Sequence, residues 1–389
     1  MLLFRSAQIR LPAVALLAAA SLAGLVYAPA RAAEAPADHD RTLTRQLEEL
    51  TKAPGGPPGA IAVLKRGTRT DVYRAGVARI GKPRPIAVTD HMRIASTAKA
   101  FSGAVSLQLV DRGKLRTDDT IGKVLPRLPR AWHRVTLRQL LNHTSGLPDY
   151  TMDPEFLDLV TADPRRHFNS RRLLDFVADE PLGFRPGSRY NYSNSDNIAV
   201  ALMAEAVTGR RYEELLAQLV YRPLNLRSTS LPQGYRMPEP YMRGYDVTPP
   251  NPPEDISEAL SASGVWASGG IVSTPKDMTS FIRAYAGGKL ISDRTRRQQL
   301  NLVNGASEPA GPGKNKAGLA IFRYTTRCGV VYGHTGNFPG YTQLIAATPD
   351  GKRSLTVSLT TQVNKTNKPE LLERLRTVEE NFVCALLRK

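Results

Sequence analysis

Cysteine and histidine, the usual ligands of zinc, are scarce in this 389-residue chain. It contains 2 cysteines and 6 histidines, and they are scattered rather than grouped at zinc-ligand spacing. We therefore expect neither a metal site nor a bound cofactor. Repeats with a period of about 20 to 50 residues are also lacking, which argues against a solenoid or a propeller. The hydrophobic content of 41% is that of a folded protein with a large core.

Acidic residues are fewer than basic ones. The chain has 35 aspartates and glutamates and 53 lysines and arginines, which gives a formal net charge of +18. Nucleic-acid binding is one interpretation of this charge. The basic residues are dispersed and no recognition motif accompanies them, so we expect no nucleic-acid partner. Attraction to anionic polymers of the cell envelope and simple solubility are the other interpretations, and charge alone does not choose between them.

An apolar run long enough to span a membrane occurs only near the N-terminus. Arg5 and Arg10 precede an apolar stretch over residues 11–28, and a small-residue "ARA" cleavage site follows at once. This order predicts a signal peptide over residues 1–33, with an uncleaved membrane anchor as the alternative. We therefore expect an exported protein, secreted, extracellular or associated with the cell envelope. We also expect a monomer without a stable membrane span after cleavage.

Export makes the two cysteines informative. Cys328 and Cys384 are the only pair available in an oxidising compartment, so the sequence predicts a disulfide between them. Closing this loop of about 57 residues would stabilise the fold by roughly 4 kcal/mol in the loop-entropy model. Two free buried thiols are the alternative.

Both ends of the remaining chain, residues 34–388, have the pattern of a helix with antiparallel strands. The two ends are expected to join in one sheet with the terminal helices packed on it, while the middle is helical and broken by proline- and glycine-rich loops. The fold class is therefore α/β (α+β), a single domain whose antiparallel sheet is flanked by N- and C-terminal helices and carries an inserted α-rich lobe. We expect the α/β lobe over about 38–90 and 316–388, and the α-rich lobe over about 91–315, with the site between them.

The individual elements follow from periodicity and turn residues. The terminal helices are expected over residues 38–52 and from Pro369 onward, because leucines recur there at helical spacing. Alternating apolar residues bounded by turns predict the strands. These are residues 60–67, 69–80, 316–325, 328–336, 341–348 and 353–361.

Residues 93–110 predict an amphipathic helix with Ser96 and Lys99 on its first turn. Side chains three residues apart project from the same side of a helix. A lysine whose pKa is lowered by burial and nearby positive charge can take the proton of a serine hydroxyl and make it a nucleophile. An N-cap serine followed by a solvated lysine is the alternative. A second match, Ser273 to Lys276, is interpreted as the capped start of another helix.

Tyr192 and Asn194 form a second candidate motif, on a loop within "YNYSNSDN" (190–197). The phenol could pass a proton to a leaving group if nearby cations depress its pKa. The amide could hold the substrate carbonyl and the lysine. An asparagine-rich helix cap is the alternative interpretation.

His334, Thr335 and Gly336 form a third candidate motif at the end of a predicted strand. A cationic or hydrogen-bonding side chain, a hydroxyl and a glycine that permits close backbone approach would make a substrate-facing strand edge. A strand that simply ends in a turn is the alternative.

Taken in order, Ser-x-x-Lys, Tyr-x-Asn and a basic-Thr-Gly strand resemble the serine β-lactamase/D-Ala-D-Ala carboxypeptidase superfamily, in its class C-like branch. "LQLVDRGKL" (107–115), "LLNHTSGL" (140–147) and "GGIVST" (269–274) strengthen the resemblance, which covers residues 40–388. His-Thr-Gly and the cysteine pair look most like secreted serine D-alanyl-D-alanine carboxypeptidases.

This resemblance implies a role for each residue of the first two motifs. Ser96 is the nucleophile that becomes acylated, and Lys99 accepts or relays its proton. Tyr192 acts as general acid and base, and Asn194 positions the substrate. The fold implied is that of a β-lactamase or transpeptidase.

The resemblance also assigns the strand residues to substrate binding. His334 and Thr335 supply a positive, hydrogen-bonding wall, with Gly336 beside them. The backbone N–H groups of Ser96 and Asn337 form the oxyanion hole.

Two positions depart from the carboxypeptidases of this branch, which place a threonine after His-Thr-Gly and an arginine on the preceding strand to bind the terminal carboxylate. Here these positions are Asn337 and Phe322. Arg323 is the neighbouring candidate for carboxylate binding, but adjacent strand residues point to opposite faces. The departures favour an esterase or amidase that acts on other acyl donors.

The expected activity is that of an exported D-Ala-D-Ala carboxypeptidase that forms an acyl-enzyme. Its partners would be peptidoglycan stem peptides or other small acyl donors, with β-lactams as inhibitors. A class C-like β-lactamase or a β-lactamase-fold esterase is the alternative within enzymes. A non-catalytic envelope-binding protein is the remaining alternative.

Overall fold

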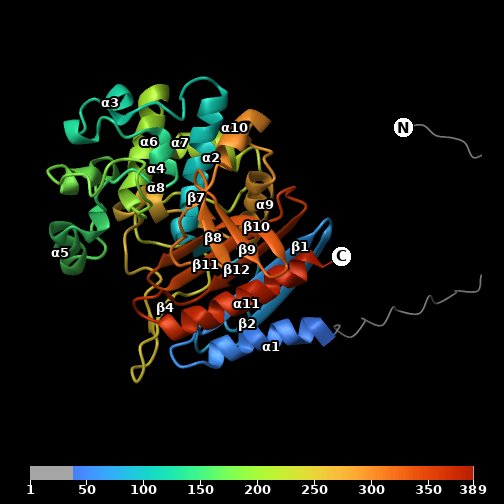
Figure 1. The fold of residues 1–389 in the computed structure, drawn as a ribbon. Coiled ribbons are helices and arrows are strands. Elements are labelled where there is room, and N and C mark those ends of the chain that lie inside the picture. Colours follow the sequence, from blue (N-terminus) through green and yellow to red (C-terminus); the bar gives the residue numbers. More distant parts are fainter. Residues whose placement is uncertain (1–37, 389) are drawn as a thin grey trace, which may run out of the picture. The chain divides into compact units, whose positions relative to one another are not determined.

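The computed structural model describes residues 38–388, so the predicted signal peptide over residues 1–33 lies outside the described residues. Within the described part, no helix has both the length and the apolar character needed to cross a membrane. An antiparallel sheet with two terminal helices on one face and a helical region on the other forms the fold (Figure 1). The fold class expected from the sequence is confirmed.

The main sheet has eight strands in the order β2-β1-β12-β11-β10-β9-β8-β7. The pairing of β1 with β12, which sets Ala60 opposite Leu359, joins the two ends of the chain in one sheet. The strands are β1 (Gly59–Arg66), β2 (Arg69–Gly76), β7 (Val303–Asn304), β8 (Lys314–Ala317), β9 (Phe322–Thr326), β10 (Gly329–Phe338), β11 (Tyr341–Ala347) and β12 (Arg353–Leu359). Short two-stranded pairs are β3 (Met92–Arg93) with β6 (Val272–Ser273) and β4 (Tyr245–Asp246) with β5 (Glu254–Asp255).

The single strand predicted over residues 316–325 is wrong, because two strands, β8 and β9, occupy this segment. They form a hairpin in which Ala317 lies opposite Phe322. Ala320 has a positive φ of 53° in the connection, and its backbone N–H donates to the carbonyl of Leu141, 2.7 Å away. A backbone contact from a distant helix therefore breaks a segment whose own pattern is continuous.

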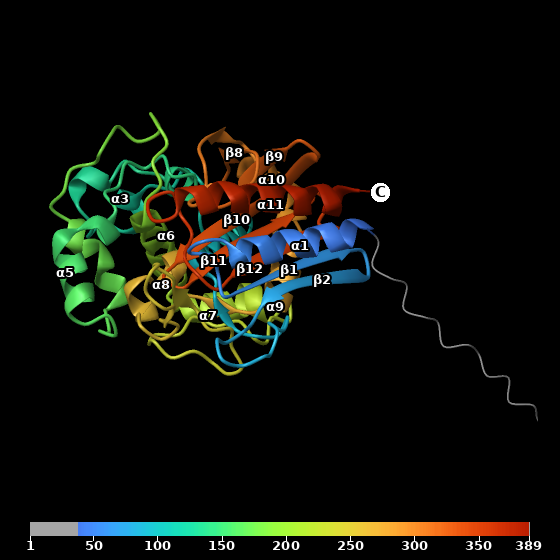
Figure 2. The same cartoon turned by 90° about the horizontal axis from the view of Figure 1, so that it is seen from below.

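The helices α1 (Asp38–Lys52) and α11 (Pro369–Leu387) lie side by side on one face of the sheet (Figures 1 and 2). Leucines at helical spacing on both helices are buried against the strands. Phe382 of α11 packs edge-on against Tyr73 of β2, with 5.2 Å between ring centroids. The apolar stripes read from the sequence are thus the faces that cover the sheet.

Cys328 and Cys384 form a disulfide with a Cα–Cα distance of 5.1 Å. Cys328 stands in the turn between β9 and β10, and Cys384 stands in the last turns of α11. The bond fixes the end of α11 to the start of the strand that leads to Gly336.

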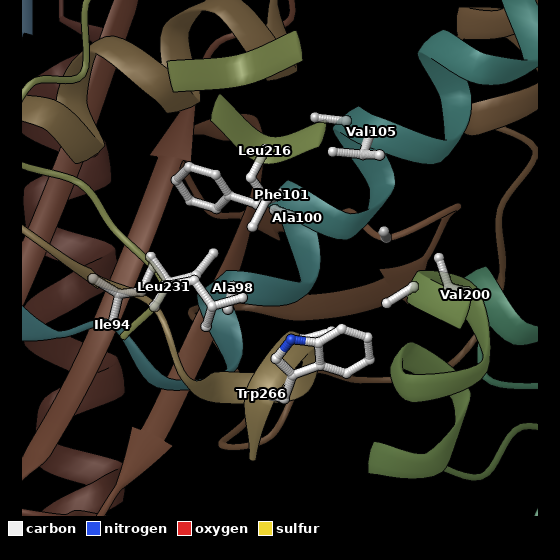
Figure 3. Close-up of a cluster of buried hydrophobic side chains, with 14 of the residues drawn as sticks. Ile94, Ala98, Ala100, Phe101, Val105, Val200, Leu216, Leu231 and Trp266 are labelled. Carbon is white, nitrogen blue, oxygen red and sulfur yellow. The ribbon is translucent and has the colours of Figure 1, made fainter. Parts of the chain in front are cut away.

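Helices cover the other face of the sheet and surround α2 (Ala98–Asp111). Figure 3 shows part of this core, where Phe101 of α2 and Trp266 of α8 belong to one buried cluster. The other helices are α3 (Ile121–Val124), α4 (Leu137–Leu141), α5 (Pro154–Ala162), α6 (Asn194–Thr208), α7 (Tyr212–Leu216), α8 (Trp266–Gly269), α9 (Pro275–Ala286) and α10 (Asp293–Gln299). Short turns of other helix types are η1 (Ala95–Thr97), η2 (Arg130–Trp132), η3 (Tyr150–Met152), η4 (Ser170–Val177), η5 (Ala217–Tyr221) and η6 (Ala262–Gly264).

The helix α2 differs from its prediction in one respect. Residues 93–110 were expected to bury one face, whereas every residue from Ala98 to Leu109 is buried. The reason is that β10 lies on one side while α6, α8 and η5 enclose the others. Small residues such as Gly103 permit this enclosure, because a Cβ there would lie 2.3 Å from the Tyr285 hydroxyl.

The second Ser-x-x-Lys match is structural, as expected. Thr274 caps α9 by accepting a hydrogen bond from the Asp277 N–H, and Pro275 occupies the first turn. Lys276 is exposed on the surface of α9. This lysine therefore has none of the burial found at Lys99.

Candidate active site

Ser96 lies in the short η1 turn that leads into α2, at the junction of the sheet and the helical region. The preceding residue, Ala95, has a positive φ of 52°, so the turn presents the serine in a conformation that an ordinary helix start does not provide. Backbone strain at a single non-glycine residue is common at functional sites. Ser96 is half-buried and lines the cavity described below.

Strand β10 passes close behind this turn because Gly336 has no side chain. A Cβ at Gly336 would lie 2.6 Å from the Ile94 carbonyl oxygen and 3.1 Å from the Ser96 backbone nitrogen. Any larger residue would push the strand and Ser96 apart. The close backbone approach predicted for this glycine is therefore present.

Lys99 is fully buried and its ammonium group is held at three points. Its Nζ lies 3.1 Å from the Ser96 Oγ, 2.8 Å from the Asn194 Oδ1 and 2.8 Å from the Ser268 carbonyl oxygen. Burial lowers the pKa of Lys99 to about 7, although the negative charges of Asp149 and Glu308 act in the opposite direction. At neutral pH a large fraction of Lys99 is therefore an uncharged amine, able to take the Ser96 proton.

Nearby positive charge, which the sequence analysis invoked to lower this pKa, does not contribute. The charges that act on Lys99 are carboxylates, and they raise its pKa. Desolvation alone lowers the pKa of Lys99.

Asn194 begins α6 and bridges Lys99 to an aspartate that sequence analysis did not single out. Its Nδ2 donates to the Asp149 Oδ2 at 3.0 Å and to the Thr151 Oγ1 at 3.2 Å. The backbone N–H of Asn194 also donates to the Asp149 Oδ2, at 3.1 Å. These bonds fix the amide so that its oxygen faces Lys99. Asp149 stands two residues after the end of the "LLNHTSGL" stretch, and this proximity was the only sequence signal for it.

Tyr192 packs beside Lys99, whose Nζ lies 4.9 Å from the tyrosine ring centroid. The Tyr192 hydroxyl is enclosed and makes no hydrogen bond within residues 38–388. Burial raises its pKa well above the usual value, and the Ser96 hydroxyl nearby offsets this only in part. The depressed pKa that a proton-passing phenol was expected to need is therefore wrong, because burial raises the pKa of Tyr192 and the Glu308 and Asp149 carboxylates raise it further. Tyr192 is a neutral phenol, which suits a proton donor.

The His143 ring packs against the Tyr192 ring, with 4.4 Å between the two ring centroids. Its Nδ1 lies 2.7 Å from the Asp196 Oδ2, and Ser145 donates to the other oxygen of this buried carboxyl group. Burial lowers the pKa of His143 to about 3, so the ring is neutral. Through His143, the "LLNHTSGL" stretch therefore packs against Tyr192.

His334 and Thr335 are buried and do not line the cavity. The His334 Nδ1–H donates to the Thr335 carbonyl oxygen at 2.6 Å, and burial lowers the pKa of His334 to about 3. The Thr335 hydroxyl donates to the Pro309 carbonyl oxygen at 2.5 Å. The positive wall expected from this pair is wrong, because a fully buried imidazole stays uncharged.

Asn337 does line the cavity, but its side chain is bound to protein. Its Nδ2 donates to the Val363 carbonyl oxygen at 2.7 Å and to the Thr342 Oγ1 at 3.1 Å. Its Oδ1 accepts from Asn364 at 3.1 Å. The amide therefore braces the end of β10. Its backbone N–H stays a prediction as the second oxyanion donor.

Arg323 does not line the cavity, so it cannot replace the missing carboxylate anchor there. It stands opposite Tyr332 in the β9–β10 pair. The neighbouring Phe322 packs its ring edge-on against His334, 5.0 Å between centroids. The position expected to carry a cation thus holds an aromatic ring.

A cavity of about 1190 Å³ opens over Ser96. Its apolar side comes mainly from α5 and the segments around it, with Phe156, Val160 and Phe168. Its polar side carries four charged residues, namely Glu308, Lys365, Glu373 and Arg376. Glu308 was missed by sequence analysis, because a lone glutamate before a proline has no motif. Within residues 38–388, no group of three or more His, Cys, Asp or Glu side chains is arranged to hold a metal ion.

Comparisons with known proteins agree with this geometry. A family model described as "Beta-lactamase" matches residues 43–380. Penicillin-binding protein 4* of Bacillus subtilis is 25% identical over 312 residues, covering 76% of this chain and 66% of that protein. A putative D-alanyl-D-alanine carboxypeptidase of Escherichia coli is 25% identical over 279 residues, covering 70% of this chain and 58% of that protein. The chain thus spans less than two thirds of the length of these curated relatives.

Two of the similar solved structures are matched over nearly their whole length. A D-stereospecific amidohydrolase from Streptomyces sp. superposes with a TM-score of 0.75 at 29% identity, covering 87% of this chain and 98% of that one. A D-amino acid amidase from Ochrobactrum anthropi SV3 superposes with a TM-score of 0.77 at 23% identity, covering 90% and 99%. The second likeness establishes the fold alone.

Proposed function

Because the chain belongs to the beta-lactamase family, we propose that it is a serine hydrolase that cleaves an amide bond of a D-amino acid residue through an acyl-enzyme on Ser96. The observation that carries this proposal is the contact of 3.1 Å between the Lys99 Nζ and the Ser96 Oγ, with the lysine pKa lowered to about 7. A buried amine beside an alcohol is the arrangement that activates serine without a histidine.

The proposed reaction moves one proton at each step. Neutral Lys99 takes the Ser96 proton as the oxygen attacks the substrate carbonyl. Tyr192, held neutral by burial, donates its proton to the leaving amine as the C–N bond breaks, and the Lys99 ammonium then restores the phenol. Water hydrolyses the resulting ester in a second round.

The first candidate activity is that of a D-Ala-D-Ala carboxypeptidase acting on peptidoglycan stem peptides and acylated by β-lactams. The curated relatives named above support it. We propose that the protein acts outside the cytoplasm, where the disulfide between Cys328 and Cys384 would persist.

The second candidate is an amidase that needs no terminal carboxylate on its substrate. One structural observation favours it, since Phe322 stands where a carboxylate-binding cation was expected and His334 is neutral. The D-stereospecific amidohydrolase among the similar structures supports the same alternative.

Covalent labelling tests the shared step of both candidates. A fluorescent penicillin should label the wild-type protein at Ser96, with the modified peptide identified by mass spectrometry. The Ser96→Ala variant should stay unlabelled. Equal labelling of the two proteins would contradict an acyl-enzyme on Ser96.

A matched pair of substrates separates the candidates. The pair is an N-acyl-D-Ala-D-Ala peptide with a free C-terminal acid and the same peptide as its C-terminal amide. A carboxypeptidase should prefer the acid strongly, whereas an amidase should accept both. A chromogenic cephalosporin and a short-chain nitrophenyl ester, assayed in parallel, would reveal a β-lactamase or an esterase instead.

A further inference from the structure

The segment over residues 306–310 forms the polar wall of the active-site cavity and is fixed at both ends. The Tyr190 hydroxyl donates to the Ala306 carbonyl oxygen at 2.5 Å. The Thr335 hydroxyl donates to the Pro309 carbonyl oxygen at 2.5 Å. The segment therefore has one defined path past the nucleophile rather than the freedom of an ordinary surface loop.

Buried hydrogen bonds inside the segment strengthen this path. The Ser307 hydroxyl donates to the Pro309 carbonyl oxygen at 3.1 Å and lies 3.0 Å from the Tyr324 hydroxyl. Ser307 and Pro309 are both buried, whereas Glu308 between them is exposed. Ser307 and Pro309 therefore point into the protein, and the Glu308 carboxylate between them lines the cavity.

Glu308 has no protein partner in the described part of the chain. No hydrogen bond or ion pair joins its carboxylate to any residue from 38 to 388. The surrounding protein raises the pKa of Glu308 by partial desolvation, and the Lys99 charge opposes this. The effect of Glu308 on Lys99 and Tyr192 places its charge within electrostatic reach of the reacting groups.

The other glutamate that lines the cavity differs in this respect. Glu373 pairs with Arg376 across 3.2 Å, and the arginine also donates to the Gly311 and Gly313 carbonyl oxygens. Its charge is therefore already compensated. Glu308 is left as the carboxylate that a bound molecule would meet uncompensated.

We propose that Glu308 is a specificity-determining residue, which binds a primary ammonium group of the acyl donor beside the scissile amide. This inference rests on the amidase candidate of the proposed function and narrows its substrate class to amides and peptides that carry a free amino group. An ammonium and a carboxylate form charge-assisted hydrogen bonds, and in a cleft they do so with less screening than in open solvent. An N-acylated donor forms no such bond.

Two substrates that differ only in this charge test the inference. They are D-alanine 4-nitroanilide and its N-acetyl derivative, assayed with the wild type, Glu308→Gln and the control Glu373→Gln. Glu308→Gln should lower kcat/KM for the free amine about tenfold, equivalent to about 1.4 kcal/mol, and change it less than twofold for the acetylated substrate. Glu373→Gln should leave the ratio of the two substrates unchanged.

The pH profile supplies a readout that a merely structural role would not move. Because Glu308 raises the pKa of Lys99, Glu308→Gln should shift the acidic limb of the rate profile to lower pH for both substrates. Equal losses for both substrates, or a wild type that does not prefer the free amine, would overturn the inference.

Failure of the proposed function gives a different result, namely no turnover and no penicillin label on Ser96. In that case, the binding of two uncleaved amides tests the role of Glu308 without any turnover. Calorimetry on the Ser96→Ala variant should show tighter binding of D-alaninamide than of N-acetyl-D-alaninamide, and Glu308→Gln in that background should remove the difference. Equal or absent binding of both amides would refute the role of Glu308.

Discussion

In the proposed mechanism Lys99 determines the pH at which Ser96 is activated, and the burial of Lys99 sets the size of the effect. The ordinary pKa of 10.5 falls to about 7 through burial. At pH 7 the uncharged fraction rises from about 3 in ten thousand to about one half, a gain of more than about a thousandfold, equivalent to about 4 kcal/mol. This gain is what the buried position of Lys99 contributes to the first step.

The acylation rate should therefore follow the titration of Lys99. With a fluorescent penicillin in a stopped-flow instrument, the logarithm of the rate should rise with unit slope up to about pH 7 and level off above it. Lys99→Met should lose the pH dependence together with about a thousandfold in rate, because the variant lacks the general base. Lys276→Met, which alters the exposed lysine of the second Ser-x-x-Lys match, should behave like the wild type.

A rate that stays level from about pH 5 to 9, or one that breaks near the ordinary lysine value, would refute this reasoning. So would a Lys99→Met variant that keeps most of the wild-type rate. Circular dichroism at each pH excludes unfolding as the cause of any loss.

Three further outcomes follow from the same geometry. Lys99→Met should raise the melting temperature at pH 6, where the buried lysine of the folded wild type is charged. Between pH 7 and 10.5 the unfolded wild-type chain binds more protons than the folded one, so wild-type stability increases with pH across that window. An unchanged melting temperature at pH 6 would contradict a buried, desolvated lysine. Gly336→Ala should slow penicillin acylation about a hundredfold, because its Cβ would lie 2.6 Å from the Ile94 carbonyl oxygen and displace the nucleophile; an unchanged acylation rate would contradict the close approach. Replacing both Cys328 and Cys384 by serine should lower the free energy of unfolding in urea by about 4 kcal/mol without changing acylation of the native state; a loss below about 1 kcal/mol would contradict the loop-entropy account.

The parts of the fold that sequence could predict are those that depend on local spacing. The three-residue spacing of Ser96 and Lys99 suffices to set the hydroxyl and the amine on one side of the chain. The leucine stripes of α1 and α11 likewise identify their buried faces without knowledge of the sheet. These inferences needed only residues within one or two turns of one another.

The inferences that failed depend on residues far apart in the chain. The break at Ala320 requires the Leu141 carbonyl, about 180 residues earlier, and no periodicity encodes such a contact. The protonation states of Tyr192 and His334 depend on how completely the fold encloses them. Glu308 was missed for the same reason, because its position is set by partners on β10 and on the loop before α6.

The enclosure of α2 has a consequence for changing what this protein acts on. Since every residue from Ala98 to Leu109 is packed against a neighbour, a substitution there disturbs packing before it alters selectivity. The cavity positions open to change are those of the apolar wall of α5 and the exposed Glu308 within residues 306–310. Mutant libraries that aim at new substrates should diversify those two walls and leave the helix that carries the lysine untouched.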